Sequence, residues 1–376
     1  MANKKLKVGN VPPLRFPGFE GEWETKKLGE IGEVRMCKRI FNNETSQTGD
    51  IPFFKIGSFG KKADAFISKE LYLDYRSRFS FPKKGEILIS AAGTIGRTVV
   101  YNGEDAYFQD SNIVWIENDN QYITNEFLYY ILQIVKYNTE GGTIQRLYNN
   151  ILKSTKFNTP EIPEQAKISS FLSLIDERIQ TQNKIIEELK LLKKTIRNQL
   201  FEEILNQDNE YVQVKDVLDY EQPTKYLVIN TDYVPDDSFI PVLTANKAFI
   251  LGYTAEDFGI YDKGQCIIFD DFTMDIKFVD FPFKVKSSAI KILTAKPNVH
   301  LKFVFEYLSF LNLSSSEHKR HYISEIALME IQLPNYTQQN YVSDFLSKLN
   351  DKIETEIKVH TLLIKQKQYL LANLFI

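Results

Sequence analysis

The stretch FLSLIDERIQTQNK, residues 171–184, recurs with small changes as FLSKLNDKIETEIK, residues 345–358. Sliding the chain on itself until Phe171 meets Phe345 aligns residues 157–201 with residues 331–375 without a gap. The same register extends upstream, where QRLY (residues 145–148) meets KRHY (residues 319–322). An ungapped match of this length indicates an internal duplication, and a duplication sets the architecture of the chain.

Each copy predicts a long helix with one narrow apolar stripe. Apolar residues recur in alternating steps of three and four, which is the heptad pattern of a coiled coil. Prolines precede or open both segments, at Pro160, Pro163 and Pro334. The predicted seam consists of Ile168, Leu172, Ile175, Ile179, Ile186, Leu189, Ile196 and Leu200 in the first copy and of Val342, Leu346, Leu349, Ile353, Leu363, Leu370 and Leu374 in the second.

Two such stripes in one chain favour pairing with each other. A single stripe would fit an amphipathic helix on a globular core, but here each stripe has a partner of like length and pattern. We predict an antiparallel two-helix coiled coil, because each helix follows an equivalent domain and such pairing gives a pseudo-twofold object. Gln182, Lys193, Glu356 and Lys367 interrupt the seam and are expected to fix its register at some cost in stability.

The segments before the two helices share a mixed, β-leaning composition. GEILI at residues 85–89 stands where GQCII stands at residues 264–268, and each segment continues into one apolar helix, from Asn125 and from Leu301. The predicted fold class is therefore α+β. Two similar mixed α/β domains, residues 1–157 and 207–331, are separated by two long helices, residues 158–206 and 332–376, which form the antiparallel coiled coil.

Composition indicates a water-soluble chain and leaves nucleic acid open as a partner. The 376 residues are 43% hydrophobic and 25% charged, without an apolar run long enough for a membrane span. The N-terminal MANKKLKVGNVPP lacks the apolar segment of a secretion signal, so a cytoplasmic location without membrane association is expected. The net charge of -3 argues against nucleic acid at face value. Residues 61–97, however, hold eight Lys/Arg against four acids, enough for a local basic surface.

The loops of both domains carry the residue types that contact DNA. Lysine and arginine bind phosphates, and Arg, Asn, Gln, Ser, Thr and aromatic side chains reach base edges. In the first domain the candidates are Arg35, Lys38, Arg39, Lys55, Ser58, Lys61, Lys62, Arg76, Arg78, Thr94, Arg97, Gln109, Ser111, Asn112, Gln145, Arg146 and Tyr148. In the second they are Thr224, Lys225, Tyr226, Thr244, Asn246, Lys247, Asp271, Thr273, Lys284, Lys286, Ser287, Ser288, Lys319, Arg320, His321 and Tyr322.

Glycines in AAGTIGR, residues 91–97, have two interpretations. They could expose backbone N–H groups to a phosphate, or Gly93 and Gly96 could simply turn a hairpin. The sequence leaves both open.

The most enzyme-like motif is FDDFT, residues 269–273. Paired carboxylates can hold a metal or act as acid and base, but a nuclease site needs a further acid and a nearby lysine, and only Lys277 is close in sequence. A structural or base-contacting role is therefore preferred. His318 and His321 could bind zinc, yet Cys37 and Cys266 lie far away in sequence. The sequence has no GxxxxGK[ST] or GxGxxG motif and no Asn/Asp-Pro-Pro-aromatic tetrapeptide of amino-methyltransferases. We expect a chain that is not catalytic by itself and binds no metal.

Several stretches together resemble the specificity subunits of type I restriction-modification systems. They are VPPLRFPGFEGEWETKKLGEI (residues 11–31), GEILISAAGTIGR (residues 85–97) and PEQAKISSFLSLIDERI (residues 163–179), followed by a heptad helix. The resemblance covers essentially the whole chain. The second domain departs from the pattern, because FDDFT replaces AAGT and GTIGR is absent.

The resemblance implies two target-recognition domains, each reading one half of a split sequence in double-stranded DNA. It also implies helices that act as spacer and docking surface for two modification subunits, which methylate adenine with S-adenosylmethionine. Two restriction subunits would bring ATP- and magnesium-dependent translocation and cleavage, so the cofactors belong to partners and none to this chain. Two other functions remain open: a coiled-coil scaffold with two protein-binding domains and no DNA role, and an autonomous nuclease acting through Asp270 and Asp271.

Overall fold

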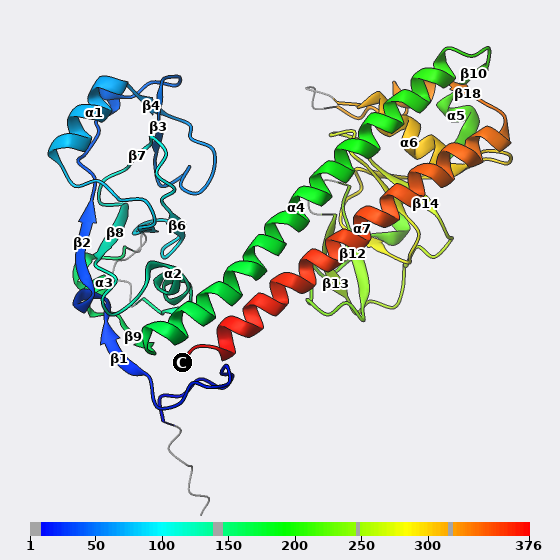
Figure 1. The fold of residues 1–376 in the computed structure, drawn as a ribbon. Coiled ribbons are helices and arrows are strands. Elements are labelled where there is room, and N and C mark those ends of the chain that lie inside the picture. Colours follow the sequence, from blue (N-terminus) through cyan, green and yellow to red (C-terminus); the bar gives the residue numbers. More distant parts are fainter. Residues whose placement is uncertain (1–8, 138–145, 246–248, 315–318) are drawn as a thin grey trace, which may run out of the picture. The chain divides into compact units, whose positions relative to one another are not determined.

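The computed structural model describes residues 9–137, 146–245, 249–314 and 319–376. The chain divides into two compact units: unit 1 is formed by residues 1–182 with residues 359–376, and unit 2 by residues 183–358. Two long helices, α4 (Ile162–Leu205) and α7 (Tyr336–Asn373), contribute one end to each unit (Figure 1).

The strands of unit 1 form small sheets around one central antiparallel sheet. The central sheet has the order β2 (Gly32–Met36), β8 (Ile113–Asn118), β5 (Ile87–Ser90) and β6 (Thr98–Val100). A second sheet has the order β4 (Phe66–Ile67), β3 (Ile51–Phe54) and β7 (Tyr107–Phe108), with β3 and β7 parallel. A two-stranded ribbon joins β1 (Glu24–Lys27) to β9 (Lys156–Thr159). All four residues of β5 are buried, so this apolar strand lies at the centre of the domain.

Three short α-helices are described in unit 1, and two of them begin at side-chain caps. They are α1 (Lys69–Arg78), α2 (Asn125–Ile134) and α3 (Asn149–Ser154), with 3-10 turns η1 (Leu28–Glu30) and η2 (Asn42–Glu44). The hydroxyls of Ser68 and Thr124 each accept a hydrogen bond from the third residue of the following segment, Leu71 and Phe127, which starts α1 and α2. The apolar face of α2 then packs into the core of the domain.

Unit 2 repeats this arrangement strand for strand. Its central sheet has the order β11 (Leu218–Glu221), β17 (Ile290–Ala295), β14 (Cys266–Asp270) and β15 (Ile276–Val279). The second sheet has the order β13 (Ile250–Thr254), β12 (Ile240–Leu243) and β16 (Lys284–Val285), and the ribbon joins β10 (Glu210–Gln213) to β18 (Glu330–Leu333). The helical elements are α5 (Val214–Val217), α6 (Leu301–Leu311), η3 (Pro223–Tyr226) and η4 (Ile326–Leu328). Helix α1 has no counterpart between β13 and β14, where residues 255–265 form no helix.

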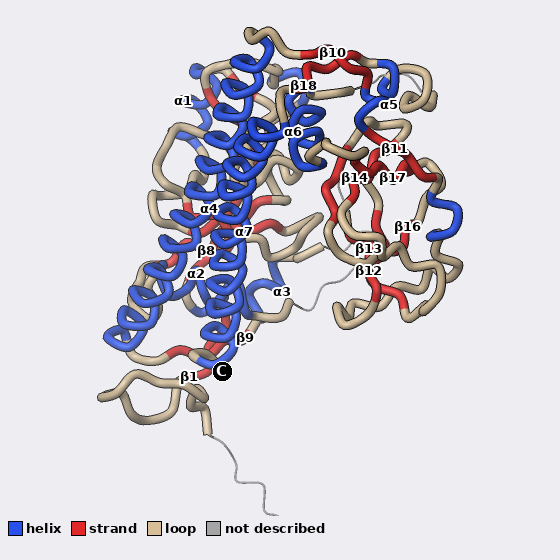
Figure 2. Tube along the Cα trace, turned by 90° about the vertical axis from the view of Figure 1, so that its right-hand side faces the viewer, coloured by secondary structure: helices blue, strands red, loops and turns tan. Residues whose placement is uncertain are grey.

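The two long helices pair in opposite directions within each unit (Figures 1 and 2). In unit 1, Ile168 and Leu172 from the start of α4 share a core with Leu370 and Leu374 from the end of α7. In unit 2, the end of α4 packs in the same way on the start of α7. All fifteen predicted seam residues are buried or half-buried. The predicted fold class, α+β with two similar domains and an antiparallel helical pair, is confirmed. Helix α4 begins at Ile162, a few residues after the predicted start at 158.

A repeated glutamine fastens each long helix to its domain. The side chain of Gln165 donates to the carbonyl of Pro160 (2.9 Å) and accepts from the backbone N–H of Thr124 (2.9 Å), which caps α2. Its equivalent Gln339 donates to the carbonyl of Pro334 (2.8 Å) and accepts from the N–H of His300 (2.9 Å), which caps α6. Because both glutamines are buried, these hydrogen bonds orient helix and domain strongly.

Polar seam residues also connect the helices to the domains. In unit 1, Lys367 of α7 pairs with Asp176 of α4 at 2.6 Å, and the hydroxyl of Tyr130 on α2 donates to the same carboxylate at 3.0 Å. In unit 2, the equivalent Lys193 contacts Asn350 of α7 at 3.3 Å and Glu306 of α6 at 2.7 Å. Asn350 occupies the position in the second copy that Asp176 occupies in the first, so the duplication preserves the lysine and this contact.

An aromatic side chain near the C-terminal end of each long helix completes the core of a domain: Phe201 lies within α4, and Phe375 follows α7. Phe375 is 4% exposed, with its ring centroid 5.2 Å from that of Phe127 and 6.2 Å from that of Trp23. Its equivalent Phe201 is fully buried against Tyr307, at 5.0 Å, in unit 2. The domain of unit 1 is therefore completed by residues that are far from it in sequence.

Candidate nucleic-acid interface

Four loops of unit 1 meet where β3 and β5 end and where β8 begins. We call this cluster edge 1; it comprises residues 55–60, 91–97, 109–112 and 146–148. The side chain of Gln109 accepts from the N–H of Ile56 (2.9 Å), and Arg97 donates to the carbonyl of Phe59 (2.9 Å). Backbone hydrogen bonds join Ala91 to Asn112 and to Leu147. Loops that are distant in sequence thus form one surface.

The AAGTIGR loop of edge 1 is a hairpin turn. Gly93 and Gly96 both have positive φ, 65° and 80°, which glycine adopts without strain. The N–H of Gly96 donates to the carbonyl of Ser90 (2.9 Å), and the N–H of Arg97 donates to the Ser90 hydroxyl (2.8 Å). These two N–H groups are occupied within the turn, which favours the hairpin interpretation over a phosphate cradle.

Edge 1 gathers about half of the candidates predicted in the first domain. Its members are Lys55, Ser58, Thr94, Arg97, Gln109, Ser111, Asn112, Arg146 and Tyr148. Beside it lies a pocket of about 330 Å³, lined in part by Ser111, Arg146 and Tyr148. Thr94, Arg146 and Tyr148 are exposed, which makes them available to a ligand.

The other candidates of the first domain are placed differently. Arg35, Arg39, Arg76 and Arg78 form ion pairs with Glu117, Asp110, Asp105 and Asp74 at 2.7–3.2 Å. The ammonium group of Lys38 lies 5.3 Å from the centre of the Phe79 ring. Lys61 and Lys62 are exposed in the loop that follows residue 60. Gln145 lies outside the described residues.

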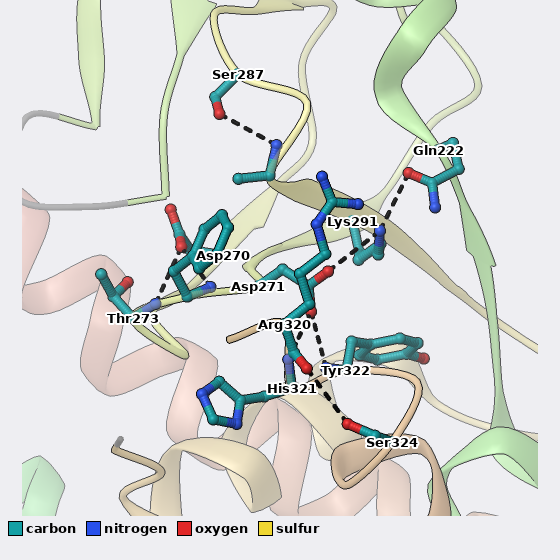
Figure 3. Close-up of polar contacts among 12 residues, drawn as sticks. Gln222, Asp270, Asp271, Thr273, Ser287, Lys291, Arg320, His321, Tyr322 and Ser324 are labelled. Carbon is teal, nitrogen blue, oxygen red and sulfur yellow. Dashed lines mark hydrogen bonds and ion pairs between the residues drawn. The ribbon is translucent and has the colours of Figure 1, made fainter. Parts of the chain in front are cut away.

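In unit 2 the FDDFT motif is part of a buried ion-pair network (Figure 3). Asp271 and Lys291 are 3.2 Å apart, and each side chain is 1% exposed. One carboxylate oxygen of Asp271 accepts from the N–H groups of His321 (3.1 Å) and Tyr322 (2.8 Å). The ammonium group of Lys291 also donates to the side chain of Gln222 at 3.1 Å. We call Asp271, Lys291 and Gln222 the clamp, because they hold the strand β14, the strand β17 and residues 320–322 together.

The neighbouring carboxylate has a structural role as well. Asp270 accepts hydrogen bonds from the N–H groups of Phe272 (2.9 Å) and Thr273 (3.0 Å), which closes the turn after β14. Both aspartates are therefore occupied by backbone donors, and Asp271 by a lysine as well. Among the residues that the structure describes, no three His, Cys, Asp or Glu side chains gather as metal ligands would. This arrangement favours the structural interpretation of FDDFT over a nuclease site.

Burial corrects seven of the predicted DNA contacts. Their side chains lie inside the domains: Ser58, Tyr226, Thr244, Asp271, Lys284, His321 and Tyr322. Lys284, for instance, is fully buried and pairs with Glu256 at 2.8 Å, while it donates to the carbonyl of Phe258 at 2.7 Å. Such residues shape the loops from within, and their side chains are not exposed to a ligand in this structure.

The remaining candidates of the second domain stay on its surface. Thr224, Lys225, Thr273, Lys286, Ser288, Lys319 and Arg320 are exposed, and Ser287 is half-buried. Asn246 and Lys247 lie outside the described residues. Sequence reasoning missed Lys291 and Gln222 of the clamp. A signal for the first was present, since a lysine inside the apolar run AIKIL needs a buried partner.

The two cysteines lie in different units and are buried. Burial raises the pKa of both thiols to about 12, so neither is a thiolate at neutral pH. Among the described residues, the structure contains no helix with the length and apolarity of a membrane span.

Comparison with known proteins agrees with this arrangement. Residues 20–191 match the family described as type I restriction modification DNA specificity domain. A putative type I restriction enzyme specificity subunit of Haemophilus influenzae is 55% identical over 166 residues, which are 44% of this chain and 42% of that protein. The EcoR124I/EcoR124II specificity subunit of Escherichia coli is 47% identical over 131 residues, 33% of this chain and 32% of that protein. The match therefore spans less than half the length of either relative.

A solved structure extends the likeness of fold over the whole chain. The S subunit of a type I restriction-modification system from M. genitalium superposes with a TM-score of 0.64 over 97% of this chain and 99% of that one, at 16% sequence identity. The fold defines a protein with two similar domains in tandem, built on a pair of long helices. Residues 20–191, a little under half of the chain, thus resemble the type I restriction modification DNA specificity domain, and the chain shares the fold of the S subunit from M. genitalium.

Proposed function

We propose that the chain is the DNA sequence-specificity subunit of a type I restriction-modification complex, and that each β domain reads one half of a bipartite target. The observation that carries this proposal is the repeated surface at the end of the central sheet. In both units the segment with an exposed arginine, Arg146 or Arg320, is joined by a backbone hydrogen bond to the loop after a central strand, which carries an exposed threonine, Thr94 or Thr273. Arginine and small polar groups are the side chains that read base edges and phosphates.

The proposal assigns the chemistry to partners. Two modification subunits would dock on the paired helices and methylate adenine with S-adenosylmethionine, and two restriction subunits would add ATP- and magnesium-dependent cleavage. This chain would supply the sequence specificity and the surface on which the other subunits assemble, in the cytoplasm, where the DNA is. Asp270 and Asp271 support the absence of catalysis here, because backbone donors and Lys291 occupy them.

Domain exchange tests the division of the target. Residues 23–152 would be replaced by the first domain of another specificity subunit, and methylated sites would be mapped on genomic DNA with the modification subunits present. We expect one half-site to change and the other to remain. A change in both halves would contradict independent reading.

Binding at several salt concentrations separates this function from a scaffold that does not bind DNA. Contacts to phosphates release counterions, so the DNA affinity of the complex should fall steeply as salt rises. Affinity that does not depend on salt, or no DNA binding by the assembled complex, would favour the scaffold.

The long helices are proposed to set the unread gap between the half-sites. One heptad added to each helix lengthens it by about 10 Å, since an α-helix rises about 1.5 Å per residue. Methylation mapping should then show a longer gap of unspecified bases. An unchanged gap in an active complex would refute a spacing role.

A further inference from the structure

Arg146 and Arg320 occupy equivalent places in the two units. They hold the same position in QRLY and KRHY, in the register of the duplicated helices. The N–H of Leu147 donates to the carbonyl of Ala91 at 2.9 Å, and the N–H of His321 donates to the carbonyl of Asp271 at 3.0 Å. Ala91 and Asp271 are the residues that follow β5 and β14. Each arginine is thus carried on a short arm, residues 146–148 or 320–322, attached at the end of a central strand.

Different interiors hold the two arms in the same position. In unit 1 the support is apolar, because Ala91, Val114 and Leu147 are buried in one core. In unit 2 the clamp holds the arm, with Asp271 accepting from two backbone N–H groups of residues 321 and 322. Figure 3 shows the Arg320 guanidinium and the His321 ring on opposite sides of this arm. The duplicated domains have changed their support and kept the exposed arginine.

The guanidinium groups of these arms are available, unlike those of the other arginines in the two domains. Arg35, Arg39, Arg76 and Arg78 are ion-paired, and Arg97 donates to a carbonyl. Arg146 and Arg320 have no carboxylate partner among the described residues. One nitrogen of Arg146 donates to the Asn112 side chain at 3.2 Å, which orients the plane of the guanidinium while its other N–H groups remain exposed.

We propose that Arg146 and Arg320 are paired base-reading residues, one for each half of the DNA target, and that each recognises a guanine. The planar guanidinium fork suits the two acceptors, O6 and N7, on the major-groove edge of guanine, and in Arg146 the contact with Asn112 orients it. The same fork can also bind a phosphate through two parallel hydrogen bonds, and the substitutions below distinguish the two partners. This inference rests on the proposed function and names the residues that carry it.

The test compares R146A and R320A, each assembled with the modification subunits, by mapping methylated adenines across a genome. We expect R146A to lose preference at one base position in one half-site, by roughly 5- to 150-fold, since a bidentate contact contributes that much discrimination. R320A should do the same in the other half-site only. The unaffected half-site is an internal control for folding and assembly in each variant. R146K and R320K serve as conservative variants, because lysine keeps the charge and loses the planar fork.

Two results would overturn the inference. If the methylated motif stays the same while every site is methylated less, and lysine restores the level, the arginines bind phosphates. If either substitution leaves both the motif and its extent unchanged, the arginine does not contact DNA. The domain exchange described above separates this failure from failure of the proposed function: when the exchange still changes one half-site, the function stands and only the assignment of the arginines falls.

Discussion

Replacing Asp271 with alanine is expected to destabilise unit 2 by about 3–5 kcal/mol, the usual cost of breaking a buried ion pair by removing one partner. Asp271 and Lys291 are each 1% exposed and 3.2 Å apart. At that distance their attraction is about 5 kcal/mol for an effective dielectric constant near 20. Without Asp271, the ammonium group would stay buried with only Gln222 as a partner, and the N–H of Tyr322 would lose its acceptor.

A second substitution separates the charge effect from the lost volume. Adding Lys291→Met to Asp271→Ala removes the buried, unpaired charge of the lysine and keeps a side chain of similar length. Unit 1 shows that an apolar interior supports the same geometry, because Ala91 and Val114 occupy the equivalent places. We expect the double variant to be at least about 2 kcal/mol more stable than Asp271→Ala alone, since apolar groups often replace a buried ion pair at little cost.

Native-state hydrogen exchange, measured by mass spectrometry on peptides of β14 and β17, reports this stability. Tryptophan fluorescence would not, because Trp23 and Trp115 both lie in unit 1. Peptides of β5 and β8 serve as the reference within the same molecule. Two results would refute this reasoning. One is a decrease of less than about 1 kcal/mol in the free energy of unfolding of Asp271→Ala. The other is a double variant whose decrease equals the sum of those of Asp271→Ala and Lys291→Met.

Three further predictions concern the contacts between helices and domains. Phe375→Ala should destabilise unit 1 by about 3–5 kcal/mol in denaturant titrations followed by tryptophan fluorescence, whereas Ile376→Ala, half exposed, should change it by less than about 0.5 kcal/mol. Gln165→Ala should cost about 1–3 kcal/mol by leaving the N–H of Thr124 without its acceptor, visible as faster hydrogen exchange at the start of α2 and not in unit 2. Burial lowers the pKa of His300 below its ordinary value of 6.5, so the unfolded chain takes up a proton first as the pH falls. Unit 2 should therefore lose stability as the pH drops through 6.5, and hydrogen exchange at about pH 7.5 and about pH 5.5 should show a smaller difference in His300→Asn.

The helical part of the fold was predictable because its signal is local. The heptad stripe needs only the spacing of apolar residues along one helix, and the duplication indicated which second helix would match it. Even the polar seam position Lys193 was visible, although its contact with Glu306 on α6 was not. That contact depends on how α6 lies against α4, which no local pattern encodes.

The candidate interface was predictable only in part, because burial of a polar side chain depends on sheet register. Lys284 and Lys291 look alike in sequence to exposed lysines, yet each has a carboxylate partner, Glu256 or Asp271, in another segment of the chain. The partner comes close only after neighbouring strands have paired. Loop composition identified the arms with Arg146 and Arg320, and the structure was needed to distinguish these exposed arginines from the ion-paired ones.

The closing of unit 1 by residues 359–376 has a consequence for biosynthesis. Unit 2 is one continuous segment, residues 183–358, whereas the core of unit 1 needs Phe375 and the contact from the N–H of Leu14 to the carbonyl of Asn373. A ribosome adding roughly 5–20 residues per second takes on the order of 10–35 s to pass from residue 182 to residue 359. The domain that is synthesised first therefore keeps part of its apolar core exposed until the second domain has been made. A premature stop anywhere in α7 would leave the first domain incomplete, and a stop before residue 358 would shorten both units.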